Sequence, residues 1–281
     1  MRVGMNPLRD ERMAVSDLPV IAVLVHLPHE QDYHVSRFEI VTASLTLARQ
    51  SAGTDHHFLI WDNGSSPKMR EWLLDFAPDT LILSHNVGVL NAMTRIYHAF
   101  RDSVIAWCND DMLYYPDWLG PQLELLEAFP EGVVSGCVTR YYSCKADENT
   151  IEWARKCGKL SAVNTPSLWD MQHGISIGRG KGEAASVFVN AVIPSVEYNG
   201  HTALIGGGHC QFVSRAETVI PFLHPTERYM HPLFKTLDES IDAAGILRLM
   251  TTKRLTRHLG NVLTDDDKME INSLLAESRK E

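Results

Sequence analysis

The sequence predicts an α/β protein built on a mainly parallel central sheet. Through residues 19–140, short apolar runs alternate with segments whose apolar residues recur every three or four positions, which is the pattern of βαβ units. Each of the first four apolar runs also stops at a polar or glycine-containing turn. Because parallel strands place their carboxyl ends at one edge of a sheet, we expect these turns to converge on one crevice.

The elements follow from these patterns in chain order. Strands are expected at residues 19–26, 57–61, 79–84, 103–108 and 133–137. Apolar residues at helical spacing predict helices at residues 38–48, 67–76, 90–100 and 119–126. The four turns that should meet at the crevice are residues 27–29, 62–66, 85–88 and 109–111.

The chain after residue 140 has a less regular pattern. Glycines cluster over residues 174–182, where a flexible loop and a phosphate cradle both remain open, but no Ser or Thr follows Lys181 as a P-loop requires. Residues 206–213 are typical of a loop entering a strand. The acids of residues 236–242 are followed by apolar residues at helical spacing, Ile246 and Leu249. Because acids in a first helical turn favour the helix dipole, a helix start remains an alternative to a chemical role for them. From residue 264 onward we expect a capped amphipathic helix.

Composition narrows the class of protein. The chain has 281 residues, of which 44% are hydrophobic, so it can bury a full core. A net charge of −9 without a Lys/Arg run argues against nucleic acid as a partner. Five cysteines without CxxC spacing favour a reducing compartment over a disulfide framework or a zinc site. The apolar run at residues 18–27 is too short for a transmembrane helix, and no signal peptide is evident, so we expect a cytoplasmic protein.

The most informative stretch is the fourth apolar run with the residues that end it. Strand 103–108 gives way to Asn109, Asp110 and Asp111. Adjacent carboxylates repel each other, and a hard cation such as Mg²⁺ or Mn²⁺ relieves that repulsion. A solvated acidic turn is the alternative, because Asn and Asp are ordinary turn formers.

Three strand-end motifs occur in a characteristic order. They are Asp62-Asn63-Gly64-Ser65, then Asn86-x-Gly88-x-x-Asn91, then Asn109-Asp110-Asp111 with Pro116-x-Trp118-Leu119 behind it. In this order the chain resembles the nucleotide-sugar-binding half of glycosyltransferase family 2, whose members have a GT-A (Rossmann-like) fold. The resemblance is clear over residues 19–140 and weaker over 206–261.

The resemblance in the middle of the chain, together with the residue pattern of its two tails, divides the chain into four segments. Residues 1–18 would be a flexible arm and residues 19–140 the nucleotide-sugar-binding half. Residues 141–262 would be the acceptor-binding and catalytic half of the same domain, and residues 263–281 a C-terminal amphipathic helix.

The resemblance also implies roles for individual residues. Contacts to the nucleotide-sugar would come from Pro28, Asp62, Asn86, Asn91, Asn109 and Asp110. The DxD-type motif has Asn109 where its first Asp usually stands, which leaves Asp111 as the best metal ligand, with His258 as a late ligand of the metal or the diphosphate. Asp238 and Glu239 fall where the family carries an acidic pair that contains the catalytic base. Their order is reversed here, so either could be the base.

The chemistry of diphosphate binding adds one more candidate binding residue. Arg254, with its basic neighbours Lys253 and Arg257, could hold a diphosphate or could belong to a solvated basic face.

These features predict a metal-assisted, inverting glycosyltransferase. The donor would be a UDP-, GDP- or dTDP-sugar, the acceptor a saccharide or other hydroxyl compound, and the cofactor Mn²⁺ or Mg²⁺. A GT-A-like module that binds a nucleotide or a partner without catalysis is the alternative from a different class. A sugar nucleotidyltransferase would need a glycine-rich basic signature after the first strand, and residues 27–30 lack it. The sequence leaves room for an oligomer.

Overall fold

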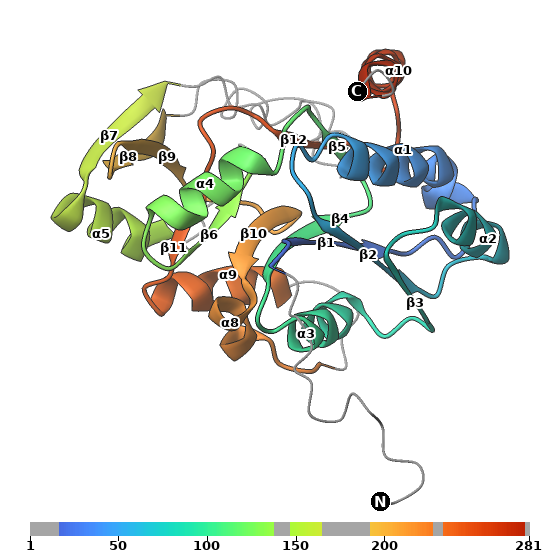
Figure 1. Cartoon of the computed structure of the whole chain (residues 1–281), viewed down its shortest axis with the longest axis horizontal. Helices are drawn as coiled ribbons and strands as arrows, with labels where there is room; N and C mark the ends of the chain where they lie inside the picture. Colours follow the sequence, from blue (N-terminus) through green and yellow to red (C-terminus); the bar gives the residue numbers. More distant parts are fainter. Residues whose placement is uncertain (1–16, 138–146, 165–191, 227–232, 279–281) are drawn as a thin grey trace, which may run out of the picture.

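The computed structural model describes residues 17–137, 147–164, 192–226 and 233–278. These residues form three layers, with helices packed on both faces of a central sheet (Figure 1). Within the described residues, none of the helices combines the length and hydrophobicity needed to cross a membrane.

The first half of the chain alternates strands and helices as predicted. Its strands are β1 (Val20–Val25), β2 (His57–Asn63), β3 (Thr80–Ser84), β4 (Val104–Asn109) and β6 (Gly132–Ser135). Its helices are η1 (Asp32–His34), α1 (Arg37–Gln50), α2 (Pro67–Phe76), α3 (Val89–Ala99) and α4 (Gly120–Ala128). Each of the five strands and four helices expected from the spacing is therefore present, with small shifts at its ends.

The later elements complete the sheet and cover it. The strands are β7 (Lys159–Asn164), β8 (Val192–Tyr198), β9 (His201–Ile205), β10 (Gln211–Arg215) and β11 (Leu247–Met250). The helices are α5 (Glu148–Cys157), α8 (Ala216–Val219), η3 (Ile220–Phe222), α9 (Leu233–Ala243) and α10 (Asp265–Ser278).

The strand order across the large sheet is β3-β2-β1-β4-β10-β6-β11-β9-β8-β7. The first four strands are parallel, and β10 enters antiparallel between β4 and β6. Because β1 to β4 run in one direction, their carboxyl ends lie at one rim, which is where open α/β sheets bind ligands.

The side chains of β1 point alternately to the two faces of the sheet, and each set packs against a different layer of helices. Ile21, Val23 and Val25 face a core shared with α1, α2, α4 and α10, whereas Val20, Ala22 and Leu24 face a core shared with α3, α8 and α9. A parallel strand covered on both faces is apolar throughout, and the six residues of β1 are all buried.

A short second sheet was not predicted. It pairs β5 (Met112–Tyr114) antiparallel with β12 (Thr256–His258). β5 begins directly after the acidic residues that end β4, so this small sheet brings a distant segment of the chain to the same rim.

One alternative and one prediction for the second half are wrong. Asp238 and Glu239 lie in the middle of α9, so they are not acids of a first helical turn. Ile246 and Leu249 do not continue a helix, because Gly245 at φ +81° ends it and residues 247–250 form β11. The strand after residue 206 and the C-terminal helix are confirmed, and Thr264 Oγ1 accepts the Asp267 N–H at the start of α10.

Candidate functional site

The acidic tip of β4 is buried and paired with an arginine that the sequence did not single out. Arg37, the first residue of α1, places Nη2 at 2.5 Å from Asp110 Oδ1 and Nη1 at 2.9 Å from Asp111 Oδ2. All three side chains are nearly inaccessible to solvent. The solvated turn that the sequence left open is therefore excluded, since one guanidinium spans both carboxylates inside the protein.

His258 reaches the same tip from β12. It pairs with Met112 of β5, and the next residue, Leu259, donates its N–H to the Asp111 carbonyl at 2.8 Å. The imidazole Nε2 then lies 3.2 Å from Asp111 Oδ1. The structure thus brings together Asp111 and His258, the two residues expected to hold a metal.

Burial and neighbouring charges act in opposite directions on the two carboxyls. Burial by itself raises the pKa of Asp111, but the charges of His258 and Arg37 lower it further, so its pKa falls well below the usual range. For Asp110 burial prevails over the attraction of Arg37, and its pKa is raised. Asp111 is the member of the pair that stays ionised most readily, which suits a ligand for a cation.

The side chains fit a cation that is completed by its substrate. Within the described ranges, no group of three or more His, Cys, Asp or Glu side chains is arranged to hold a metal ion. Asp111 Oδ1 is nevertheless buried, lacks a well-formed hydrogen bond and faces His258. Magnesium is commonly held by one or two protein ligands together with phosphate oxygens and water, and Asp111 with His258 fits that description.

His26 joins three of the four predicted turns and was also missed by sequence reasoning. Its backbone N–H donates to Asp110 Oδ2 at 3.1 Å, and its Nδ1 donates to the Asn63 carbonyl at 2.8 Å. Its Nε2 lies 3.5 Å from Asn86 Nδ2. The ends of β1, β2, β3 and β4 therefore meet at one rim, as the sequence predicted.

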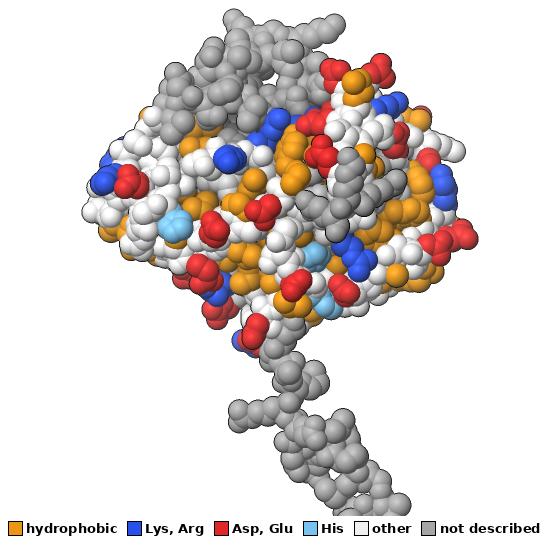
Figure 2. All heavy atoms as spheres, turned by 45° about the horizontal axis from the view of Figure 1, so that its top comes forward, with side chains coloured by type: hydrophobic (Ala, Val, Ile, Leu, Met, Phe, Trp, Pro, Cys, Tyr) orange, Lys and Arg blue, Asp and Glu red, His pale blue; other side chains and the backbone are white. Residues whose placement is uncertain are grey.

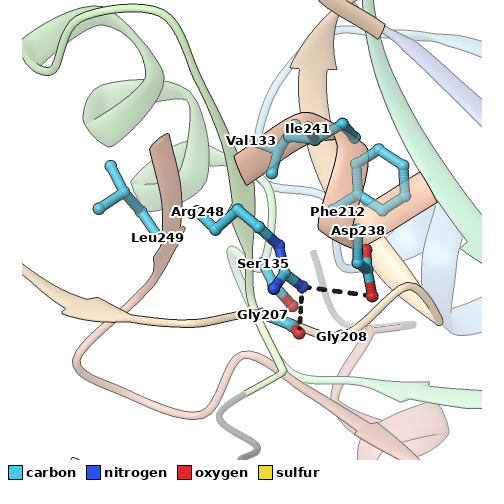
Figure 3. Close-up of a pocket in the computed structure, with 9 residues that line it drawn as sticks. All are labelled: Val133, Ser135, Gly207, Gly208, Phe212, Asp238, Ile241, Arg248 and Leu249. Carbon is cyan, nitrogen blue, oxygen red and sulfur yellow. Dashed lines mark hydrogen bonds and ion pairs between the residues drawn. The ribbon is translucent and has the colours of Figure 1, made fainter. Parts of the chain in front are cut away.

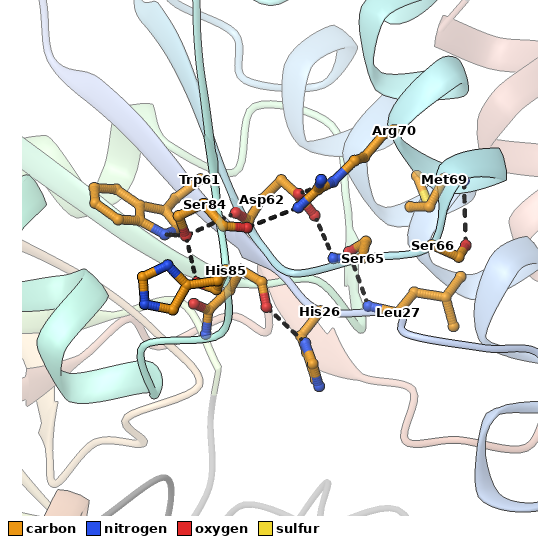
Figure 4. A network of polar contacts seen from close by, with 11 residues as sticks. His26, Leu27, Trp61, Asp62, Ser65, Ser66, Met69, Arg70, Ser84 and His85 are labelled. Atoms are coloured by element: carbon orange, nitrogen blue, oxygen red, sulfur yellow. Dashed lines mark hydrogen bonds and ion pairs between the residues drawn. The ribbon is translucent and has the colours of Figure 1, made fainter. Parts of the chain in front are cut away.

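Asp62 is fully buried, and both of its carboxylate oxygens are occupied (Figure 4). Oδ1 accepts the Ser65 N–H at 2.9 Å and Oδ2 accepts from Arg70 Nε at 2.7 Å. Ser65 Oγ in turn accepts the Leu27 N–H at 3.0 Å, which fixes the turn that contains the half-buried Pro28. In this arrangement Asp62 shapes the turns at the rim.

The two asparagines of the third turn also hold backbone in place. Asn86 Oδ1 accepts the Gly88 N–H at 2.9 Å. Asn91 binds the loop after η3, because its Nδ2 donates to the Thr226 carbonyl at 2.7 Å and its Oδ1 accepts the Thr226 N–H at 3.0 Å. Gly64 is required here, since a Cβ at that position would lie 2.8 Å from Asn86 N.

The two candidate bases lie in different environments. Asp238 is buried and lines a small cavity, where its Oδ2 is 3.3 Å from Arg248 Nη2 (Figure 3). The same oxygen lies 3.7 Å from His209 Nδ1. Glu239 is partly exposed, and Lys235, one turn earlier in α9, lies 3.7 Å away. Arg248 also contacts Asp147 at 2.8 Å, so it holds the Asp238 carboxylate from a fixed position.

The loop before β10 connects Asp238 with the acidic tip. The Asn109 N–H donates to the Cys210 carbonyl at 2.9 Å, and Gln211 pairs with Cys108. His209, which lies 3.7 Å from Asp238, directly precedes Cys210 in the chain. Cys210 is the residue that is hydrogen-bonded to the end of β4. This links Asp238 to the rim that holds Asp111 through His209 and Cys210.

Arg254 lies in the loop before β12, with its guanidinium 5.4 Å from the centre of the Tyr115 ring. Tyr115 Oη donates to Glu270 Oε1 of α10 at 2.7 Å. Arg254 is thus a half-buried cation close to β5, in keeping with either role that the sequence left open. The glycine cluster of residues 174–182 lies outside the described residues.

Comparison with known proteins identifies the family. A family model described as glycosyl transferase family 2 matches residues 37–181, just over half of the chain. The chain belongs to glycosyl transferase family 2. The expected GT-A-type α/β fold is confirmed with it.

One solved structure similar to this family 2 chain is the crystal structure of 4-diphosphocytidyl-2C-methyl-D-erythritol synthase. The similarity has a TM-score of 0.46 and 9% identity, and it covers 92% of this chain and 100% of the other. No curated protein matches the chain.

The family 2 match includes the acidic tip, Arg37 and the asparagines of the third turn. Pro28, Asp238, Glu239, Arg254 and His258 lie outside the matched residues. Among these residues, the structure pairs His258 with Asp111 at the tip of β4 and places Asp238 beside His209.

Proposed function

We propose that this family 2 chain transfers a sugar from a nucleotide-diphosphate sugar to an acceptor hydroxyl, with inversion at the anomeric carbon. The observation that supports the proposal is the pairing of Asp111 with His258 at the carboxyl ends of parallel strands. Asp238 is linked to the same rim through His209, which precedes Cys210 in the chain, and the Cys210 carbonyl accepts the Asn109 N–H. The face seen in Figure 2 has acidic and basic side chains interspersed without a continuous basic stripe, which suits a small anionic donor better than a nucleic acid.

The donor would lie across the rim formed by the first four strands. The turns fixed by Asp62 and Asn86 would shape the nucleoside end, with Pro28 and Asn91 beside them. The diphosphate would then extend toward Asn109, Asp110 and Asp111, where Arg254 could add positive charge. His26 would keep these turns in register, because it contacts three of them at once.

The acceptor hydroxyl would lose its proton to Asp238. As the acceptor oxygen forms its bond to the anomeric carbon, the bond from that carbon to the diphosphate oxygen breaks and its electron pair leaves with the nucleoside diphosphate. A single displacement of this kind inverts the anomeric carbon. Arg248 and His209 hold the Asp238 carboxylate in place for the proton transfer.

Asp111 and His258 would hold a divalent cation, Mn²⁺ or Mg²⁺. When bound, such an ion supplies Lewis-acid stabilisation of the departing diphosphate. Asp110 is engaged by Arg37 and the His26 N–H, so its role would be to fix the tip of β4 rather than to contact the ion.

A non-catalytic nucleotide-binding module is the second candidate. The pairing of Asp238 with a buried arginine favours it, because a carboxylate in a salt bridge is less available as a base. This module would bind nucleoside diphosphates in the same way and would not turn over the donor.

A panel of UDP-, GDP- and dTDP-sugars, each incubated with Mn²⁺, tests the proposal by release of the nucleoside diphosphate. We expect at least one donor to be hydrolysed slowly, and Asp111→Asn to abolish that release. Asp102→Asn is the matched control, since Asp102 is an exposed aspartate just before the opposite end of β4. Tight nucleotide binding without release of product from any donor would favour the module.

A further inference from the structure

The pairing of Arg37 with the acidic tip differs from the other arginine pair at this rim. Arg70 binds one carboxylate, that of Asp62, and its side chain is 37% exposed. The Arg37 side chain is 7% exposed and divides its two terminal nitrogens between Asp110 and Asp111. Arg37 is therefore a fixed positive charge built into the place where the family 2 chain is expected to receive a cation.

An arginine is positively charged at any pH at which the protein is folded. Formally, Arg37 leaves the two carboxylates with one uncompensated negative charge instead of two. It also occupies Asp111 Oδ2, so only Oδ1, which faces His258, remains for a metal ion. A free divalent cation approaching this oxygen is attracted weakly and is repelled by the guanidinium close behind it.

We propose that Arg37 is the resident counter-ion of the Asp110–Asp111 pair and makes cation binding depend on the nucleoside diphosphate. The diphosphate brings the negative charge and the oxygen ligands that the protein withholds, so ion and donor bind together. This inference rests on the proposed function for the identity of the second ligand, the nucleoside diphosphate. The effect of Arg37 on binding of the cation alone is independent of the proposed function.

The arrangement gives Arg37 a reason to be buried. Without it, two adjacent carboxylates inside the protein would have to be neutralised by a metal or by protons before any donor arrived. With it, a positive charge of the protein itself holds the tip of β4, from which β5 pairs with β12 and positions His258.

The test measures Mn²⁺ binding by loss of the electron paramagnetic resonance signal of the free ion, first without and then with UDP or GDP. The wild-type protein should bind Mn²⁺ weakly alone and roughly tenfold or more tightly with the diphosphate. Arg37→Met should bind Mn²⁺ alone roughly tenfold or more tightly than wild type, so that the diphosphate adds less. Arg49→Met is the control, because Arg49 is a half-buried arginine near the other end of the same helix, where it lies 3.9 Å from Asp79 instead of pairing with the acidic tip, and it should match wild type.

Arg37→Met leaves two buried carboxylates unpaired and could fail to fold. The double variant Arg37→Met with Asp110→Asn avoids this, because it removes one charge of each sign and releases Asp111. It should also bind Mn²⁺ alone more tightly than wild type. Equal Mn²⁺ affinity in wild type and in the folded variants would overturn the proposal for Arg37. Absence of any nucleotide binding in wild type would instead overturn the proposed function.

Discussion

Asp238 and Glu239 are neighbours in α9, yet their amide variants should differ sharply in activity. Asp238 is buried next to Arg248 and His209, whereas Glu239 is partly exposed, with the Lys235 ammonium 3.7 Å away. Loss of a general base lowers turnover by roughly 10²- to 10⁴-fold. We expect Asp238→Asn to lose turnover in that range, and Glu239→Gln to stay within about twofold of wild type, as is usual for exposed side chains.

The expected cost in stability is small enough for the comparison to be made on folded protein. Arg248 keeps Asp147 at 2.8 Å and the Gly207 carbonyl at 2.8 Å when the Asp238 charge is removed. Loss of its third partner should cost about 1–3 kcal/mol. For a chain of this size that corresponds to a fall in Tm of roughly 2–10 °C.

The assay is transfer or donor hydrolysis with kcat and KM measured separately, alongside thermal unfolding and calorimetric binding of the nucleoside diphosphate. Asp238→Asn should lose kcat while nucleotide affinity is retained, because the acid lies outside the turns that are proposed to hold the nucleoside. If Asp238→Asn retained full kcat, or if Glu239→Gln were the inactive variant, the assignment of the base from burial and position would be refuted.

Three further results are expected. His258→Gln should weaken Mn²⁺-dependent binding of the nucleoside diphosphate by roughly tenfold or more, measured by calorimetry, while binding without metal changes little. Burial raises the pKa of Asp267 in α10, but hydrogen bonds from Thr264 and Arg257 lower it further, so the ionised form stabilises the fold. The destabilisation by Asp267→Asn in urea should therefore be full at pH 7 and shrink as the pH falls below about 4, and a constant difference would contradict this sign. Asp242 accepts four hydrogen bonds from Asn149 and Thr150 at the start of α5, so Asp242→Ala should cost about 3 kcal/mol or more in urea unfolding, and a loss under 1 kcal/mol would contradict it.

The first half of the fold could be predicted because its signals are local. The spacing of apolar residues and the turn chemistry after each strand lie within a few positions of one another, and they gave α2 its observed bounds. The convergence of the turns then followed from parallel strand direction alone.

The small sheet could not be predicted because it has no local signal. β5 is three residues long, and its partner β12 follows more than 140 positions later. The helix wrongly extended past residue 243 does carry a signal. Gly245 donates its N–H to the Asp242 carbonyl at 2.8 Å in the left-handed conformation typical of helix ends, and a glycine at that place predicts the stop.

The same reason explains which site residues were missed. Arg37 and His26 lie 73 and 84 positions from their partner Asp110, and neither belongs to a motif. Asp111 and His258 could be proposed from the family resemblance, but their separation of 3.2 Å depends on β12 and could only come from the structure. The choice of Asp238 over Glu239 likewise depends on which face of α9 is buried.

The most direct measurement is a crystal structure of the protein grown with Mn²⁺ and a nucleoside diphosphate, with data collected at the manganese absorption edge. An anomalous peak between Asp111 Oδ1 and His258 Nε2, with the diphosphate beside it at the ends of β1 to β4, is the expected result. A nucleotide bound elsewhere on the molecule, or manganese bound away from both of these side chains, would contradict the assignment of this rim as the donor site.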